Sequence, residues 1–156
     1  MSKLFALIPA AGSGERMGNK VLPKQYLPLV GKPVLHHALD CLCRHPEIER
    51  VFVVLAADDR HFARYDWQPF AAKLAPLYCG GETRAASVFN GLLAVRDAVD
   101  DGDWVLVHDA VRPCLAPEVL ERLIASLRDQ PTGGLLALPV VDTLKRGDSN
   151  ATVVRT

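Results

Sequence analysis

Short apolar runs alternate along the chain with stretches in which apolar residues recur every three or four positions. The runs predict strands, and the helical spacing predicts helices between them. In order, strands are expected at 3–9, 50–56, 77–79, 104–107 and 134–140, and helices at 33–43, 58–65, 83–99 and onward from Pro117. The runs at 50–56 and 104–107 do not alternate polar with apolar residues, which is typical of parallel strands buried on both faces. The pattern therefore predicts an α/β fold, with a mostly parallel sheet and helices on both of its faces.

Two of the predicted helices have a clear apolar stripe of the kind that faces a core. For the helix at 83–99 the stripe consists of Ala85, Val88, Phe89, Leu92, Val95 and Val99. For the helix that Pro117 opens it consists of Leu120, Leu123, Ile124 and Leu127.

The pattern changes after Val140. Residues 142–156 are mostly polar, hold a Gly-Asp-Ser-Asn turn and end in a β-prone run, which predicts a hairpin that leaves the compact domain. We therefore expect an α/β domain at 1–140 and the start of a β-arm at 141–156. Because the second strand of the hairpin has barely begun at Thr156, we also expect the chain to be a fragment of a longer protein.

The composition is that of a globular protein of about one domain. The 156 residues are 49% hydrophobic and 23% charged, and 18 basic residues balance 18 acidic ones. Proteins that bind nucleic acid usually have a basic excess, so a nucleic-acid partner is not expected. The apolar runs are too short to cross a bilayer, and the first one leads into a glycine-rich turn, so we expect a cytoplasmic location. The four cysteines include no Cys-x-x-Cys pair and are expected to be reduced thiols.

The first candidate site follows the first predicted strand. It is a turn of small residues, Ala10, Ala11, Gly12, Ser13 and Gly14. Free amides in such a turn can bind a phosphate, although an ordinary turn explains the glycines equally well, and neither a Walker loop nor the dinucleotide fingerprint is present. The phosphate-binding interpretation is favoured by two cations that follow, Arg16 and Lys24. A solvated surface lysine is the alternative for Lys24 alone.

The second candidate site is Asp109, just after the predicted strand at 104–107. A carboxylate at the carboxyl end of a buried strand can hold Mg²⁺ beside a triphosphate. The alternative is that Asp109 caps the next turn, but the nearby phosphate-binding turn favours the metal role. His108 is expected to be a structural hydrogen-bonding group more than a base.

The third candidate site is the segment 80–87. A strand-to-helix turn, with Thr83 as the helix cap, accounts for most of its residues. The functional interpretation is that Gly81 admits a flat base against the backbone while Ser87 supplies a hydrogen bond.

Five motifs lie in order along the chain. They are Ala10-Ala11-Gly12-x-Gly14-x-Arg16-Met17, Pro23-Lys24-Gln25-Tyr26, Gly80-Gly81-x-x-Arg84-x-x-Ser87, Val107-His108-Asp109-Ala110-x-Arg112-Pro113 and Asp142-Thr143-x-Lys145-Arg146. Together they resemble the 2-C-methyl-D-erythritol 4-phosphate cytidylyltransferase family over nearly the whole chain. The first motif is shared by many sugar nucleotidyltransferases, whereas the second and fourth are far more specific.

The resemblance implies a fold and an activity. The fold would be Rossmann-like, of the nucleotide-diphospho-sugar transferase type, with a protruding β-arm. The activity would be transfer of CMP from CTP to 2-C-methyl-D-erythritol 4-phosphate with release of pyrophosphate, in non-mevalonate isoprenoid biosynthesis. The resemblance also implies Mg²⁺ as cofactor and a homodimer formed through the β-arm.

The resemblance further implies residue roles. Arg16 and Lys24 would stabilise charge on the α-phosphate, and Asp109 would ligate Mg²⁺. Arg112 and Thr143 would position the methylerythritol phosphate, with Thr143 reaching across to the other subunit. The nucleotide would be bound by Ala10, Ala11, Gly12, Ser13, Gly14, Gly81, Glu82, Ser87 and Ala110. The family usually has Asp in place of Glu82, and it continues past Thr156 with a second metal-binding Asp, so a chain that ended there is expected to be inactive.

Two alternatives remain open. One is another sugar- or alcohol-phosphate nucleotidylyltransferase with the same loop, and the other is a non-catalytic nucleotide-binding homologue.

A phosphate monoester is largely anionic near neutral pH, so no general base is expected in the reaction. The choice of CTP over UTP rests on the resemblance alone.

Overall fold

The computed structural model describes residues 2–12 and 22–155 of the chain. The chain divides into two compact units, Met1–Pro117 and Glu118–Thr156.

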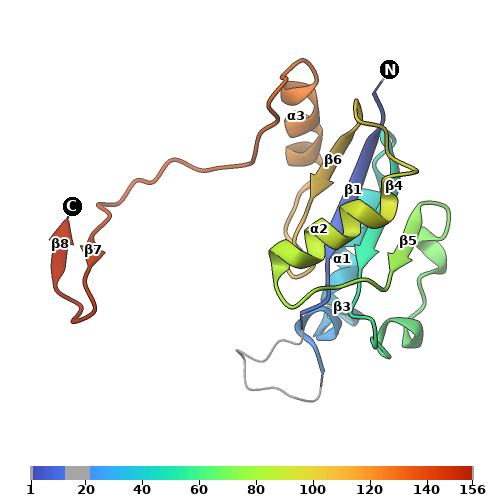
Figure 1. Cartoon of the computed structure of the whole chain (residues 1–156), viewed down its shortest axis with the longest axis horizontal. Helices are drawn as coiled ribbons and strands as arrows, with labels where there is room; N and C mark the ends of the chain where they lie inside the picture. The colour runs from blue at the N-terminus through green and yellow to red at the C-terminus, as the bar shows by residue number, and fades with distance from the viewer. Residues whose placement is uncertain (1, 13–21, 156) are drawn as a thin grey trace. The chain divides into compact units, whose positions relative to one another are not determined.

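A four-stranded parallel sheet forms the centre of the first unit (Figure 1). Its strands are β1 (Leu4–Pro9), β4 (Ile48–Val54), β5 (Leu74–Leu77) and β6 (Trp104–Val107), in the order β5-β4-β1-β6. Every neighbouring pair is parallel, so all four strands end at the same edge of the sheet. The two central strands are completely buried at Ala6, Leu7 and Ile8 of β1 and at Val51, Val53 and Val54 of β4. This confirms the predicted parallel sheet and, for the run at 50–56, the predicted burial on both faces.

Two helices cover opposite faces of the sheet, α1 (Val34–Arg44) and α2 (Arg84–Val95), as Figure 1 shows. α1 begins after Pro33, whose backbone is extended, and it buries Leu35, Leu39 and Leu42 along one face. α2 begins after Thr83 and packs on β1 and β4. Both helices start within one residue of the predicted position.

Short elements occupy the connections of the first unit. They are the hairpin of β2 (Pro28–Leu29) and β3 (Lys32–Pro33) and the single 3-10 turns η2 (Lys24–Tyr26), η3 (Phe62–Arg64) and η4 (Gln68–Phe70). The helix predicted at 58–65 is therefore reduced to η3. The Asp59 carboxylate accepts the amides of His61 and Phe62, at 2.8 and 2.9 Å, and this local bonding competes with a longer helix.

The second unit contains α3 (Pro117–Leu127) and a hairpin of β7 (Arg146–Gly147) and β8 (Val153–Arg155). The helix confirms the prediction from Pro117. In the turn of the hairpin, the Asp148 carboxylate accepts the amides of Asn150 and Thr152 at 2.9 Å each. The hairpin lies where the polar turn predicts it, while its function as a dimerisation arm and the boundary at residue 140 stay predictions.

Three strand predictions need correction. Residues 134–140 form no strand in the described chain, because the run pairs with no other described segment and a strand depends on such a neighbour for its hydrogen bonds. β6 is an edge strand of its sheet and is not buried on both faces, since Val107 is 42% exposed. The strand expected at 77–79 lies earlier, at Leu74–Leu77.

α2 buries only part of the predicted apolar stripe. Ser87, Gly91 and Val95 are buried, whereas Phe89 and Leu92 of the stripe are 61% and 39% exposed. Val95 of the stripe is thus buried as predicted, whereas earlier in the helix the small residues Ser87 and Gly91 are buried in place of Phe89 and Leu92.

Gly91 explains this orientation. A Cβ on Gly91 would lie 2.5 Å from Cγ2 of Val54 and 2.9 Å from Cδ1 of Leu7. The helix backbone thus approaches β1 and β4 more closely than any residue with a side chain allows.

None of the helices in the described ranges is long and apolar enough to cross a bilayer.

Replacing Gly91 by alanine should destabilise the protein by about 1–3 kcal/mol, because the added methyl group overpacks the helix–sheet contact. The effect should appear even though alanine usually favours a helix over glycine by about 1 kcal/mol. Urea unfolding measures the difference. Gly102→Ala is the control, since a Cβ there meets nothing within 4 Å. A Gly91→Ala protein as stable as wild type would contradict the close approach.

Candidate functional site

The carboxyl edge of the parallel sheet gathers three of the predicted segments. Residues 10–12 follow β1, residues 80–82 come soon after β5, and residues 108–112 follow β6. β1 and β6 are hydrogen-bonded neighbours, so Gly12 and Asp109 follow adjacent strands at one edge, as the sequence predicts. Three other candidates, Ser13, Gly14 and Arg16, lie outside the described residues.

Gln25 connects η2, the short turn that contains Lys24, to the turn after β1. Its side-chain amide donates to the carbonyl of Ala10 at 2.7 Å and to that of Gly12 at 3.3 Å, and the residue is 4% exposed. Lys24 precedes Gln25 in η2 and is half-buried. A buried amide with both donors used fixes the position of the backbone on each side of it. The structure therefore brings Lys24 close in space to the predicted phosphate-binding turn.

Tyr26, the last residue of η2, anchors the other side of this turn. The residue is 1% exposed, its hydroxyl donates to Asp59 Oδ2 at 2.7 Å, and its ring stacks on Tyr65 with centroids 5.6 Å apart. Burial, followed by the hydrogen bond to Asp59, raises the pKa of the Tyr26 hydroxyl, so it stays a neutral donor. The Lys24 side chain thus extends from a turn, η2, that the contacts of Gln25 hold on one side and those of Tyr26 hold on the other.

Gly80 brings the predicted base-binding loop against the turn after β1. Its amide donates to the carbonyl of Leu55 at 2.8 Å. A Cβ on Gly80 would collide with the side chain of Ala11 and with that carbonyl oxygen. The two loops are therefore in direct contact, and glycine is required at the point where they meet.

Ser87 fastens the same loop from inside α2. The residue is 2% exposed, its hydroxyl accepts the amide of Gly81 at 3.1 Å, and the carbonyl oxygens of Thr83 and Gly81 lie 3.0 and 3.2 Å from it. Thr83 caps α2, since its Oγ1 accepts the amide of Ala86 at 3.0 Å, which confirms the predicted cap. These bonds shape the loop around Gly81, while contacts of Gly81, Glu82 and Ser87 with a nucleotide stay predictions.

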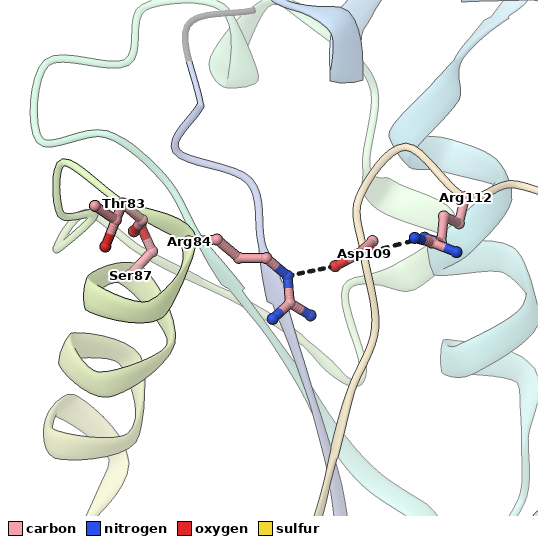
Figure 2. A network of polar contacts seen from close by, with 5 residues as sticks. All are labelled: Thr83, Arg84, Ser87, Asp109 and Arg112. Atoms are coloured by element: carbon pink, nitrogen blue, oxygen red, sulfur yellow. Dashed lines mark hydrogen bonds and ion pairs between the residues drawn. The ribbon is translucent and has the colours of Figure 1, made fainter. Parts of the chain in front are cut away.

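Asp109 lies between two arginines (Figure 2). Arg84 Nε is 2.7 Å from Asp109 Oδ1, and Arg112 Nε is 2.8 Å from Asp109 Oδ2. The side chain of Asp109 is 26% exposed, and those of the arginines are 61% and 76% exposed. Arg84 comes from the start of α2 and Arg112 from the loop after β6, so the carboxylate links two elements of the edge.

The pKa of the Asp109 carboxyl is lowered from its ordinary value. Partial burial raises this pKa, but the hydrogen bond and the charge of Arg84, followed by those of Arg112, outweigh burial. The group is therefore a carboxylate at neutral pH, which is the form that binds a cation.

His108 has a structural position. Its backbone amide donates to the carbonyl of Leu7 at 3.0 Å, which continues the pairing of β6 with β1. Its ring Nε2 lies 3.0 Å from the carbonyl oxygen of Arg112. Both contacts hold the loop that carries Asp109, as expected for a hydrogen-bonding role. Ala110, a predicted nucleotide contact, is buried in this loop with 4% of its surface exposed.

Two residues of the edge, Arg84 and Gln25, have no role in the sequence prediction beyond their presence in motifs. Arg84 follows a helix cap and Gln25 follows a lysine in a short turn, so neither position has a periodic signal. Only the contacts across the sheet edge distinguish them. Thr143 lies in the second unit, where it is exposed, and is described only within that unit.

The fold and the residues at its edge define a class of protein. A parallel α/β sheet of this Rossmann-like kind binds ligands outside the carboxyl ends of its strands, which is where this chain presents a small-residue turn, a nearby lysine and an arginine-flanked carboxylate. The family model described as "2-C-methyl-D-erythritol 4-phosphate cytidylyltransferase" matches residues 4–156. The chain belongs to this family of nucleotidyltransferases.

Individual relatives agree with the family. The chain is 56% identical to a 2-C-methyl-D-erythritol 4-phosphate cytidylyltransferase of Nitrosospira multiformis and 55% identical to one of Azoarcus sp., covering 100% and 97% of this chain. It spans 68% and 64% of the lengths of these two relatives. A solved 4-diphosphocytidyl-2C-methyl-D-erythritol synthase has a TM-score of 0.83 and 37% identity to it, over 99% of this chain and 68% of the other.

Replacing Gln25 by methionine should destabilise the protein by about 1–3 kcal/mol, because the buried carbonyls of Ala10 and Gly12 lose their donor. Urea unfolding measures the loss. Gln68→Met is the matched control, since Gln68 is exposed. Equal stability of the two variants would contradict the tie between Lys24's segment and the turn.

The lowered pKa of Asp109 predicts a pH dependence of stability. Its contribution is present above the unfolded pKa of about 4 and is lost as the pH falls through the lower folded value. Between about pH 5 and pH 2, the free energy of unfolding should therefore fall more steeply for wild type than for Asp109→Asn. Urea unfolding across this range tests it, with Asp101→Asn, an exposed turn residue, as control. Parallel curves for wild type and Asp109→Asn would refute the prediction.

Proposed function

We propose that this chain binds CTP at the carboxyl edge of its sheet and takes part in transfer of CMP to 2-C-methyl-D-erythritol 4-phosphate, with release of pyrophosphate. This reaction would belong to non-mevalonate isoprenoid biosynthesis. The observation that carries the proposal is that η2, which contains Lys24, the 10–12 turn and Asp109 lie together at one edge of the sheet. The membership of the chain in this family supports the same reaction.

The nucleotide would lie over the contact between the two loops. The backbone is accessible at Ala11, Gly12 and Gly81, because small residues leave room for a phosphate or a flat base to approach. Ser87 would act by holding Gly81 in place, since its hydroxyl is already bonded within the loop. The amino group of cytosine needs an acceptor, and a backbone carbonyl near Gly81 would supply it.

The reaction needs no general base from the protein. The phosphate of the acceptor has its second pKa near 6 and is largely dianionic at neutral pH, so it can attack the α-phosphorus of CTP in line. This agrees with the position of His108, whose ring bonds the carbonyl of Arg112. The chain's contribution would be orientation and neutralisation of charge, with Arg16 and Lys24 on the α-phosphate and Arg112 on the acceptor phosphate.

Asp109 would hold a magnesium ion. A carboxylate offers about four lone-pair sites, and each arginine uses one oxygen, so acceptors remain for a hard cation. The residues that the structure describes contain no group of three or more His, Cys, Asp or Glu side chains placed to share a metal, so water and phosphate oxygens would complete the shell. When bound, the ion would supply charge stabilisation at the phosphates.

We also propose that the protein is a cytoplasmic homodimer. The 141–156 segment, with its β7–β8 hairpin, would form the contact arm, and Thr143 would contribute to the acceptor site of the other subunit. This proposal is supported by the family and by the exposure of this polar hairpin.

The proposed activity is tested by pyrophosphate release. The full protein is incubated with Mg²⁺, 2-C-methyl-D-erythritol 4-phosphate and CTP, UTP, ATP or GTP in turn. Release should depend on CTP and on the acceptor. Release with another nucleotide and not with CTP, or with a different phosphorylated acceptor only, would replace the proposal by another nucleotidyltransferase.

In the same assay, Lys24→Ala and Arg16→Met should each lower turnover on the order of a hundredfold or more, because each removes a charge aimed at the transition state. The dissociation constant of CTP should change much less. Lys32→Ala, at an exposed lysine of β3, is the control and should leave turnover unchanged. Normal turnover in one of the two variants would remove that residue from the mechanism.

A further inference from the structure

Arg84 has a defined position at the edge of the site. It is the first residue of α2, and its backbone is fixed by the Thr83 cap and by the Ser87 contacts with the loop. From there its side chain extends toward the loop after β6 and meets Asp109, as Figure 2 shows. Arg84 thus connects the predicted base-binding loop with the predicted metal ligand.

Stability of the helix does not explain an arginine at this position. The first turn of a helix favours negative charge and disfavours positive charge, and the first turn of α2 has no acidic residue. The ion pair with Asp109 also adds little to the stability of the fold, because the Arg84 side chain is 61% exposed. A cation therefore occupies a place where local energetics disfavour it.

The cluster of Arg84, Asp109 and Arg112 has spare charge and spare donors. Two guanidinium groups and one carboxylate give it a net charge of +1. Both arginines reach the carboxylate through Nε, and within the described part of the chain the side-chain hydrogen bonds and ion pairs of Arg84 and Arg112 go through that atom. Each guanidinium has five N–H donors, so the Nη groups of both remain available to a ligand. The start of α2 adds its own preference for an anion.

We propose that Arg84 binds a phosphate group of a substrate in a site that it shares with Arg112. The Asp109 carboxylate, which is paired with both arginines, holds their guanidinium groups in position. This deepens the proposed function and rests on it only for the identity of the substrate. Arginine suits the role, because its planar fork can bind two phosphate oxygens at once. Because Arg112 is proposed to bind the acceptor phosphate, the acceptor is the expected source; a phosphate of the nucleotide is the other source, and the test separates the two.

Binding is measured with magnesium removed by EDTA, so that an effect through a metal on Asp109 is excluded, and is then measured again with added Mg²⁺. Calorimetry gives the dissociation constants of CTP, cytidine, 2-C-methyl-D-erythritol 4-phosphate and inorganic tripolyphosphate for wild type, Arg84→Met and Arg84→Lys. Arg96→Met is the matched control, because Arg96 follows the same helix and is exposed. Thermal unfolding checks that each variant is folded.

Arg84→Met should weaken tripolyphosphate and one of the two substrates at least tenfold, and leave cytidine unchanged. A loss for CTP assigns the phosphate to the nucleotide, and a loss for methylerythritol phosphate assigns it to the acceptor. Arg84→Lys should lose less than Arg84→Met, since lysine keeps the charge and lacks the fork. Arg96→Met should bind as wild type.

Three results would overturn the proposal. They are equal binding of all phosphorylated ligands by wild type and Arg84→Met, a loss that appears only when Mg²⁺ is present, and a wild-type protein that binds none of them. Tripolyphosphate binding that depends on Arg84, in a protein that releases no pyrophosphate from CTP, would instead sustain this proposal and reject the proposed function.

Discussion

Four parallel strands impose the central constraint on the first unit, because strands that run in one direction must all end at one edge. β1 is central to this arrangement, since β4 and β6 pair with its two sides and its side chains are buried against both faces. The loops after β1, β5 and β6 therefore cannot separate without breaking the sheet. In such folds ligands bind at this edge, and the candidate residues that the structure describes in the first unit lie there.

Specific side chains then convert a shared edge into a site of defined shape. Gln25 fastens Lys24's segment to the turn after β1, and Gly80 lets the next loop touch Ala11. Ser87 fixes Gly81 from inside α2. Buried hydrogen bonds hold the backbone of these loops in place, whereas the charged side chains extend from this backbone into partly exposed positions. This division suits a site that binds phosphates, because the donors are positioned before the ligand arrives.

The sequence predicts much of this fold and less of the site. Apolar runs and helical spacing locate β1, β4, β6, α1 and α3 well, because burial on a regular backbone leaves a periodic signal. The buried face of α2 is predicted only in part, since the close packing at Gly91 depends on Leu7 and Val54, which are far away in sequence. The strand predicted at 134–140 fails for a related reason, because pairing depends on a neighbour that a run of apolar residues does not specify.

The same limit applies to the charged residues. The sequence indicates Asp109 and Lys24 as candidates because each stands beside a strand end or a glycine-rich turn. The link from Arg84 to Asp109 joins residues 25 positions apart through a tertiary contact, and no local pattern indicates it. Resemblance to a family supplies the motif that contains Arg84 but not its partner.

A crystal structure of the protein with CTP and Mg²⁺ would test the central claim most directly. The account predicts that the triphosphate lies at the carboxyl edge, between the amides of the 10–12 turn and the carboxylate of Asp109, with Lys24 directed at the α-phosphate. A triphosphate bound at any other surface of the sheet, with Asp109 and Lys24 away from it, would contradict the account.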